Sequence, residues 1–292
     1  MPAHVVSFEH LDWSAAASIG VASGAQQALE SGNVVFFPDL EFTADATERA
    51  LFDPAILGSG KNTSYDPETG GLGGTALSGG DAGTLARFIR RFSDAAATLV
   101  DQLLPAYRGR TARGRASFRP AEIAGRVSSW RKDDTRLHVD SFPATPSGGR
   151  RILRVFTNVN PEGRARLWRI GDDFDAVARR FVDTLRLPIP GAGVLLTLVR
   201  VTKSPRSPYD ALMLQLHDRM KDDEDFQTRS PQTAVEFPAG STWLAFTDQV
   251  SHAAMSGQFQ LEQTFLLPVA AMQEPERSPL RILEGLKGRA LT

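Results

Sequence analysis

The stretch RLHVDSFP, residues 136–143, places a histidine and an aspartate two positions apart where an apolar strand gives way to a loop. Side chains at positions i and i+2 of a β-strand project from the same face, so His138 and Asp140 would point the same way, with Cα atoms about 6–7 Å apart. This geometry suits two ligands that converge on one cation. H-x-D also occurs by chance, so a neutral histidine beside a solvated acid is the alternative for this stretch taken alone.

The sequence around this stretch predicts an α+β fold. Helical patterns occupy residues 14–32 and 83–104, and a third helix begins at Ser207 and Pro208. From about residue 116 the chain consists mainly of short apolar runs bounded by Gly, Pro, Asn or Asp, which is typical of strands. The expected strands are NVVFFPDL (33–40), RVSSW (126–130), TRLHVD (135–140), ILRVFTNVNP (152–161), GVLLTLVRV (193–201), AVEFP (234–238), TWLAFTD (242–248) and LEQTFLLPV (261–269).

Helices followed by many short strands favour one domain with a β-sandwich or barrel at its centre. We expect a single domain over residues 1–292, with an N-terminal helical support to about residue 115 and the β core at about 116–270. The tail covers residues 271–292. Its segment SPLRILEGLKGRALT, residues 278–292, is short, basic and amphipathic, and we expect it to pack on the body.

The composition limits the chemistry. The chain has no cysteine, no apolar run of transmembrane length and no signal-peptide pattern at its N-terminus, so we expect a cytoplasmic protein without disulfides or thiolate ligands. Residues 101–170 hold 15 Arg and Lys against 6 Asp and Glu, which suits a carboxylate or phosphate ligand. A general preference for Arg over Lys is the alternative. Nucleic acid is disfavoured because the basic residues are not interleaved with aromatic ones and the net charge is −1.

A second histidine completes a ligand set. His252 follows His138 by 114 positions and lies after the aromatic strand of FPAGSTWLAFTDQVSH, residues 237–252. Two histidines and one carboxylate on the strands of a small barrel form the facial triad that holds Fe(II) and leaves coordination positions open. A zinc hydrolase could use the same ligands but needs a nearby base. We expect His217, in the middle of a charged helix, to be a surface or packing residue.

Four segments together resemble one enzyme family: KNTSYDP (61–67), LHVDSFPATPSGGRRILRVFTNVNP (137–161), LMLQLHDRMKDD (212–223) and FPAGSTWLAFTDQVSHAAMSGQ (237–258). They are similar to the Kdo (3-deoxy-D-manno-oct-2-ulosonic acid) hydroxylases, within the Fe(II)/2-oxoglutarate-dependent dioxygenases. The resemblance covers about residues 30–270. It implies a double-stranded β-helix (a jelly-roll, cupin-like core) with flanking helices, and an Fe(II) site made by His138, Asp140 and His252.

The resemblance also implies the reaction. 2-Oxoglutarate and O2 would be consumed, with ascorbate as an optional supporting reductant, and oxygen would be added at C3 of Kdo in the lipid A inner core. Many relatives anchor the far carboxylate of 2-oxoglutarate with an Arg shortly after the distal histidine, but residues 253–268 contain neither Arg nor Lys. Arg154, in an apolar strand 16 positions after His138, is the expected anchor because a buried Arg requires an anionic partner. Arg119 is next, and internal salt bridges to Asp140 or Asp248 are the alternative.

Substrate contacts are expected from two segments. Residues 60–82 form a long Gly-rich loop without a P-loop pattern, of the kind that often binds ligands. Its Lys61, Asn62 and Tyr65, together with Trp130 and Arg131, are the candidates for contact with the sugar. Gln249 and Ser251 are expected to orient the His252 imidazole.

Two other functions remain open at this point. A JmjC-like hydroxylase of a protein or another anionic molecule would share the triad and Arg154, and a cupin-like sugar-binding module would hold no functional metal. For the leading function, the partner is an anionic glycolipid, Kdo-lipid A, with no obligate protein partner. A cytoplasmic enzyme would reach this lipid by peripheral contact with the inner membrane, aided by the basic tail.

Overall fold

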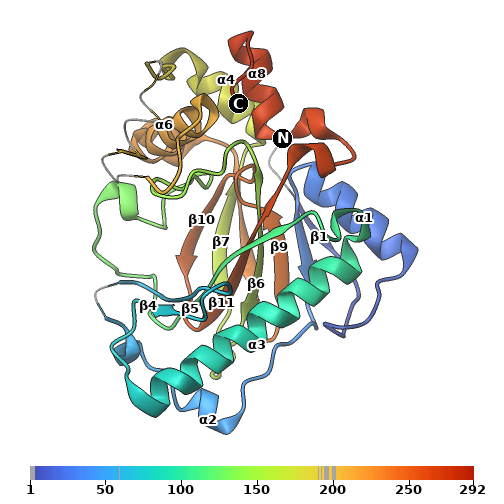
Figure 1. Cartoon of the computed structure of the whole chain (residues 1–292), viewed down its shortest axis with the longest axis vertical. Coiled ribbons are helices and arrows are strands. Elements are labelled where there is room, and N and C mark those ends of the chain that lie inside the picture. Colours follow the sequence, from blue (N-terminus) through green and yellow to red (C-terminus); the bar gives the residue numbers. More distant parts are fainter. Residues whose placement is uncertain (1–3, 59, 190, 192, 194–196, 199–201) are drawn as a thin grey trace.

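The strands form two sheets that face each other (Figure 1). The computed structural model describes residues 4–58, 60–189, 191, 193, 197–198 and 202–292. Eight strands form the larger sheet, in the order β1-β2-β9-β6-β11-β5-β3-β4, and three form the smaller one, in the order β10-β7-β8. The strands are β1 Val5–Ser7, β2 Val34–Phe37, β3 Thr63–Tyr65, β4 Leu72–Gly73, β5 Ala112–Arg119, β6 Arg151–Asn158, β7 Arg166–Gly171, β8 Gln232–Phe237, β9 Thr242–Phe246, β10 His252–Ser256 and β11 Gln260–Leu267.

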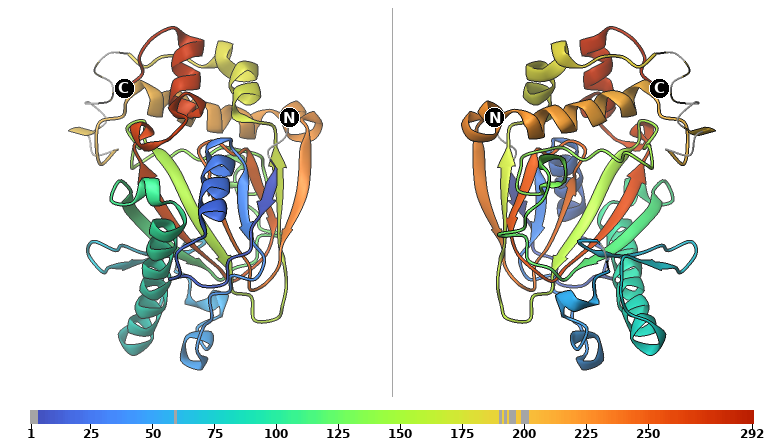
Figure 2. Two further views of the ribbon diagram at one scale, coloured as in Figure 1. Left: turned by 90° about the vertical axis from the view of Figure 1, so that its right-hand side faces the viewer. Right: turned by 90° about the vertical axis from the view of Figure 1, so that its left-hand side faces the viewer.

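Seven helices surround these sheets in the described part of the chain, which makes the fold a mixed α/β one. In Figure 2, α4, α6 and α8 gather at one end of the molecule, whereas α3 lies along the larger sheet. The helices are α1 Ile19–Glu30, α2 Ala46–Arg49, α3 Gly79–Leu103, α4 Phe174–Phe181, α6 Pro208–Asp222, α7 Glu224–Arg229 and α8 Pro279–Lys287. None of the described helices is long and apolar enough to cross a membrane.

The large sheet is held by packing against α3. The helix buries Leu85, Phe88, Ile89 and Phe92, the positions whose spacing predicted it, and packs on β5 and β11. Phe88 meets Phe118 of β5 edge to face, with ring centroids 5.5 Å apart. Burial of such large apolar side chains supplies the main driving force for docking the helix on the sheet.

Several sequence expectations are corrected. Residues 126–129 form no strand, and Trp130–Lys132 is a single 3-10 turn. The Arg-rich run before residue 120 forms β5, in which the consecutive residues 116–118 are buried, and RLWRIG forms β7, in which alternate residues from Arg166 to Ile170 are buried. Packing of these buried positions outweighs the charge of the two segments. Residues 1–115 are not only a helical support, since they supply β1 to β4 and part of β5. The strand expected at 193–201 lies largely outside the described residues.

Two other segments differ in detail. The Gly-rich loop contains the short β3-β4 hairpin, in which the positive φ of Gly74 and the close approach of the Asn62 carbonyl leave no room for a Cβ. The H-x-D segment is not a regular strand and joins the small sheet through one bridge, between His138 and His252. The tail packs on the body as expected, because α8 buries Leu280 and Leu283, and Lys287 donates to the carbonyls of Val182 and Leu185.

The start of α6 fixes the loop that follows Asp140. Ser207 and Asp210 form the expected capping box. The buried Asp210 carboxylate also accepts from the backbone N–H groups of Ser147, at 2.8 Å, and Gly148, at 3.1 Å. One side chain therefore connects the helix that covers the site to the loop over residues 141–150.

We expect Asp210→Ala to lower the free energy of unfolding by about 2–3 kcal/mol, because several buried donors lose their acceptor and α6 loses its cap. Urea denaturation measures this change. The control is Asp222→Ala, at the exposed C-terminal end of α6, which should change stability by no more than about 0.5 kcal/mol. Equal midpoints for the two variants would contradict the assigned role of Asp210.

Candidate metal centre

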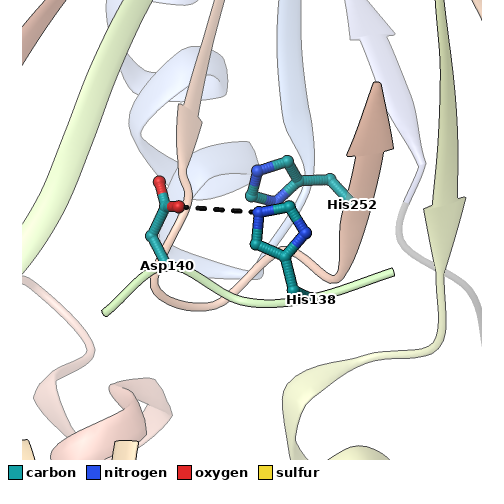
Figure 3. Close-up of side chains that lie close together, drawn as sticks. All are labelled: His138, Asp140 and His252. Carbon is teal, nitrogen blue, oxygen red and sulfur yellow. Dashed lines mark ion pairs between the residues drawn. The ribbon is translucent and has the colours of Figure 1, made fainter. Parts of the chain in front are cut away.

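His138, Asp140 and His252 lie together at the edge of the small sheet (Figure 3). Two main-chain hydrogen bonds pair the histidines, from His138 N to His252 O at 3.0 Å and from His252 N to His138 O at 2.9 Å. One ligand atom from each of the three side chains lies within 4.8 Å of the other two. His138 Nε2 is 3.8 Å from Asp140 Oδ1. The three groups are thus brought together by backbone pairing between segments far apart in sequence.

Backbone carbonyls set the orientation of both imidazoles. Nδ1 of His138 lies 2.7 Å from the carbonyl oxygen of Arg136, and Nδ1 of His252 lies 2.8 Å from that of Val250. With Nδ1 donating to these carbonyls, each Nε2 keeps its lone pair for a metal ion. Trp168 stacks on the His252 ring, with centroids 5.1 Å apart.

The expected role of Gln249 and Ser251 in orienting His252 is therefore wrong. The Gln249 side chain instead accepts from Arg151 Nη2 at 2.6 Å, and Ser251 packs tightly against Gly171. Arg151 is fully buried and pairs with Asp248 at 2.8 Å, so Asp248 is not a partner of Arg154. These contacts belong to the core beside the site.

Electrostatics keeps the triad in a form that can bind a cation. Burial lowers the pKa of both His138 and His252, so the imidazoles are neutral at neutral pH. Burial acts to raise the pKa of Asp140, but the Arg154 guanidinium outweighs it and holds this pKa below its usual range. Asp140 Oδ2 is buried and makes no hydrogen bond within the described part of the chain. Two neutral imidazoles and one ionised carboxylate fit a divalent metal ion such as Fe(II).

The triad opens into a cavity of about 400 Å³ between the sheets and α6. Three acidic residues line it, Asp134, Asp140 and Glu262. Basic residues outnumber the acidic ones among the lining residues, and the side chains of Phe156 and Trp168 form an apolar part of the wall. The seven basic residues are Lys61, Arg119, Arg131, Lys132, Arg154, Arg166 and Lys221. The cavity is suited to ligands that carry negative charge.

A chain of ion pairs runs along one wall of this cavity. Arg154 Nε lies 3.2 Å from Asp140 Oδ2, and Arg154 Nη1 lies 3.5 Å from Glu262 Oε2. Arg119 binds the same Glu262 through two hydrogen bonds of 2.9 and 3.0 Å. Burial acts to raise the pKa of Glu262, but Arg119 and Arg154 lower it below its usual range. Arg154 thus pairs with Asp140, as the alternative interpretation required, whereas Arg119 pairs with Glu262 and not with Asp140 or Asp248.

The structure brings only part of the expected substrate set to the cavity. Lys61 and Arg131 line it, and Lys61 pairs with Asp134 at 2.5 Å. Trp130 stacks against the Arg131 guanidinium in a neighbouring surface depression. Asn62 is not among the lining residues, and Tyr65 is buried in the main hydrophobic core. Alternate residues of β3 are buried, and Tyr65 is one of them. The glycine-rich composition of the segment concealed this strand pattern in the sequence.

Several cavity residues were not expected from the sequence, among them His217, Lys221, Arg166 and Trp168. The expectation for His217 is corrected, since its ring meets that of His138 edge to face at 5.3 Å and forms part of the cavity wall. The i, i+4 spacing of His217 and Lys221 was the available signal, because it places both on one face of α6. Arg166 and Trp168 could have been found only with β7 assigned as a strand.

A family model described as 3-deoxy-D-manno-oct-2-ulosonic acid (Kdo) hydroxylase matches residues 12–290. The chain belongs to this family. A comparison with curated protein sequences returned no match.

Solved structures agree with the family assignment. The Kdo hydroxylase KdoO, described as a non-heme Fe(II) α-ketoglutarate-dependent dioxygenase, in complex with α-ketoglutarate and Fe(III), matches with a TM-score of 0.95 and 45% identity. That match covers 99% of this chain and 97% of the other. The cobalt(II) complex matches with a TM-score of 0.96 and 46% identity over 98% and 97% of the two chains. Family membership favours the Kdo hydroxylase interpretation over a protein hydroxylase or a metal-free sugar-binding module.

The triad predicts which histidines bind metal. We expect His138→Ala and His252→Ala each to weaken Co(II) binding by at least about 100-fold, because each removes a ligand. His217→Ala, which removes a cavity histidine outside the triad, should change the affinity by less than about tenfold. Isothermal titration calorimetry with Co(II) measures all three. An affinity loss in His217→Ala as large as in His138→Ala would contradict the assigned ligand set.

The low histidine pKa values predict an acid sensitivity of the metal-free protein. Burial lowers the pKa of His138, His217 and His252 in the folded state, whereas unfolded histidines titrate near 6.5. Below about pH 6.5 the unfolded chain therefore binds more protons, and the free energy of unfolding should fall as the pH falls. Urea midpoints between pH 7.5 and 5.5 measure this trend. A midpoint that stays constant or rises on acidification would contradict it.

Proposed function

We propose that this protein is an Fe(II)- and 2-oxoglutarate-dependent hydroxylase of Kdo. The observation that carries the proposal is a two-histidine, one-carboxylate site inside a cation-rich cavity, in a chain that belongs to the Kdo hydroxylase family. We further assign the added oxygen to C3 of Kdo in the inner core of lipopolysaccharide. A Kdo-bearing lipid A carries carboxylate and phosphate groups, which agrees with the excess of basic residues in the cavity.

We assign the two sheets to a double-stranded β-helix. β5, β11, β6 and β9 are neighbours in the large sheet, and the bridge at His138 places the H-x-D segment beside β10 in the small sheet. The assignment takes these four strands of the eight-stranded sheet as one layer and the H-x-D segment with β10, β7 and β8 as the other, with the triad at one edge. This arrangement supports the assignment, because it places ligands from two distant segments at one end of the space between the layers.

His138, Asp140 and His252 would hold Fe(II) in this site. When bound, Fe(II) with 2-oxoglutarate and O2 supplies the oxidising chemistry that converts a C–H bond to C–OH, and 2-oxoglutarate leaves as succinate and CO2. The chain itself orients the ligands through the carbonyls of Arg136 and Val250. Phe156 and Trp168 provide apolar wall that limits water near the reacting atoms.

Arg154 is the proposed anchor for the far carboxylate of 2-oxoglutarate. It lines the cavity, is close to the triad, and is held by Asp140 and Glu262 rather than by a fixed bidentate pair. Glu262 lies on β11, in the segment after the distal histidine that lacks Arg and Lys. Arg119 takes the stronger contact with Glu262, which leaves the Arg154 guanidinium available to a ligand.

Peripheral contact with the inner membrane is the proposed route to a lipid-borne substrate. The basic tail offers less free charge than its sequence indicates, because Lys287 donates to two carbonyls and Arg281 pairs with Glu284 at 2.6 Å. The cavity rim, where Arg131 and Lys132 are exposed, is the better candidate for contact with an anionic surface.

The proposed function predicts a specific product. With Fe(II), 2-oxoglutarate and Kdo-bearing lipid A, the wild-type enzyme should form succinate and add one oxygen atom to Kdo, as measured by mass spectrometry of the treated lipid. Arg154→Met should raise the KM for 2-oxoglutarate by roughly 10–100-fold, because a charge-assisted pair is lost. Arg154→Lys should recover part of the affinity.

Arg164→Met is the matched control, since Arg164 is exposed just before β7, does not line the cavity, and pairs only with Glu162 among the ion pairs of the described chain. It should leave the KM for 2-oxoglutarate unchanged. Co(II) affinity is measured alongside to separate an effect on Asp140 from an effect on the co-substrate. Absence of both succinate and oxidised Kdo with the wild-type enzyme would refute the proposed function.

A further inference from the structure

One face of α6 points basic and polar groups into the cavity. His217 and Lys221 are four positions apart, so they lie on the same side of the helix, and both line the cavity. Nδ1 of His217 lies 3.0 Å from Asp218 Oδ1, which leaves its Nε2 as a hydrogen-bond acceptor. Lys221 is only 2% exposed, although lysine is among the residues least often buried.

Lys221 has no anionic partner among the residues that the structure describes. No carboxylate of the described chain lies within ion-pair distance of its Nζ, and its hydrogen bond there goes to the carbonyl of Arg131 at 3.2 Å. An ammonium group has three donors, so two remain available. Burial lowers the pKa of Lys221, which reflects the cost of holding this charge out of water. A buried cation without a counter-ion is what a site for an anionic ligand requires before the ligand arrives.

Most other basic residues of the cavity are already paired. Lys61 binds Asp134, Arg119 binds Glu262, and Arg131 binds Asp218. Arg166 is the comparable exception among the described residues, because it is 3% exposed and forms no ion pair. Arg166, however, is the first residue of β7, and its Nη1 donates to the Gly257 carbonyl in the turn between β10 and β11.

Lys221 is the one of these two with contacts toward the turn Trp130–Lys132 and, through His217 on the same helix face, toward a metal ligand. Its ammonium is beneath the exposed turn Trp130–Lys132, and its neighbour His217 contacts His138.

The chemistry of the sugar acid matches this position. In a 3-deoxy-2-ulosonic acid the carboxylate is attached to C2, and C3 is the next ring carbon, so the group that binds the carboxylate must be close to the metal for C3 to reach it. Given the proposed function, on which this inference rests, Arg154 serves the co-substrate and a separate cation must serve the sugar. We propose that Lys221 binds the carboxylate of Kdo and thereby presents C3 to the metal centre, with His217 accepting from a sugar hydroxyl.

The test compares two substrates in several variants. Kdo-bearing lipid A and the same lipid with its Kdo carboxylates converted to methyl esters are each assayed for oxygen gain by mass spectrometry. The wild-type enzyme should prefer the acid at least about tenfold in kcat/KM. Lys221→Met should lower kcat/KM for the acid by roughly 10–100-fold and bring the ratio of acid to ester near one. Lys221→Arg should retain part of the preference.

Controls separate this role from a structural one. The KM for 2-oxoglutarate and the affinity for Co(II) should be unchanged in Lys221→Met, which also verifies that the site has folded. Lys203→Met, at an exposed position outside the cavity, should keep the wild-type ratio.

Three results would overturn the proposal: a wild-type enzyme that accepts the ester as well as the acid, a Lys221→Met variant with the wild-type ratio, or loss of the ratio in Arg166→Met alone. Oxidation of Kdo with an unchanged ratio in Lys221→Met would remove the role of Lys221 and leave the proposed function intact. If the wild-type enzyme oxidises no Kdo substrate, both fail.

Discussion

Two hydrogen bonds between the main chains of His138 and His252 hold the site together, because they join segments that are 114 positions apart. A third main-chain hydrogen bond, from Asp140 N to the Thr247 carbonyl at 2.7 Å, fixes the position of the third ligand. The carbonyls of Arg136 and Val250 then select the ring nitrogen that faces the other ligands. Ligand geometry is thus determined by backbone pairing, which few side-chain substitutions can disturb. The side chains around the triad are left to determine what binds there.

The charge of the cavity is the second constraint. Burying several guanidinium groups is costly unless each has a partner, and the pairs of Arg154 and Arg119 with Glu262 and Asp140 meet most of that cost. The acids are too few to neutralise all the basic residues. Lys221 and Arg166 remain without an ion pair in the described chain, so the protein tolerates an unfavourable local balance of charge. A local excess of positive charge is tolerated at sites where a bound anionic ligand neutralises it.

Much of this organisation is readable from the sequence, for identifiable reasons. Short apolar runs bounded by Gly, Pro, Asn or Asp predicted β6, β9 and β11, and the H-x-D pattern with a distal histidine predicted the triad residues that the structure brings together. β5 and β7 were missed because their cavity-facing positions carry Arg119 and Arg166, so charge concealed the strand pattern. The backbone carbonyls that orient the two histidines could not be predicted from the sequence, since every residue has a carbonyl. His217 was misjudged because its neighbours on the helix are charged, whereas the face of α6 that it occupies is determined by tertiary packing.

The contact between Arg154 and Asp140 has a consequence for the order in which ligands bind. The Asp140 carboxylate is the counter-ion of Arg154, and the same carboxylate would be a ligand of the metal. A divalent cation that takes Asp140 weakens its hold on Arg154 and releases the guanidinium for another carboxylate. Each ligand should therefore tighten the binding of the other, and thermodynamic linkage requires the two enhancements to be equal. Because Asp140 is shared in this way, the co-substrate should bind weakly before the metal is bound and more tightly afterwards.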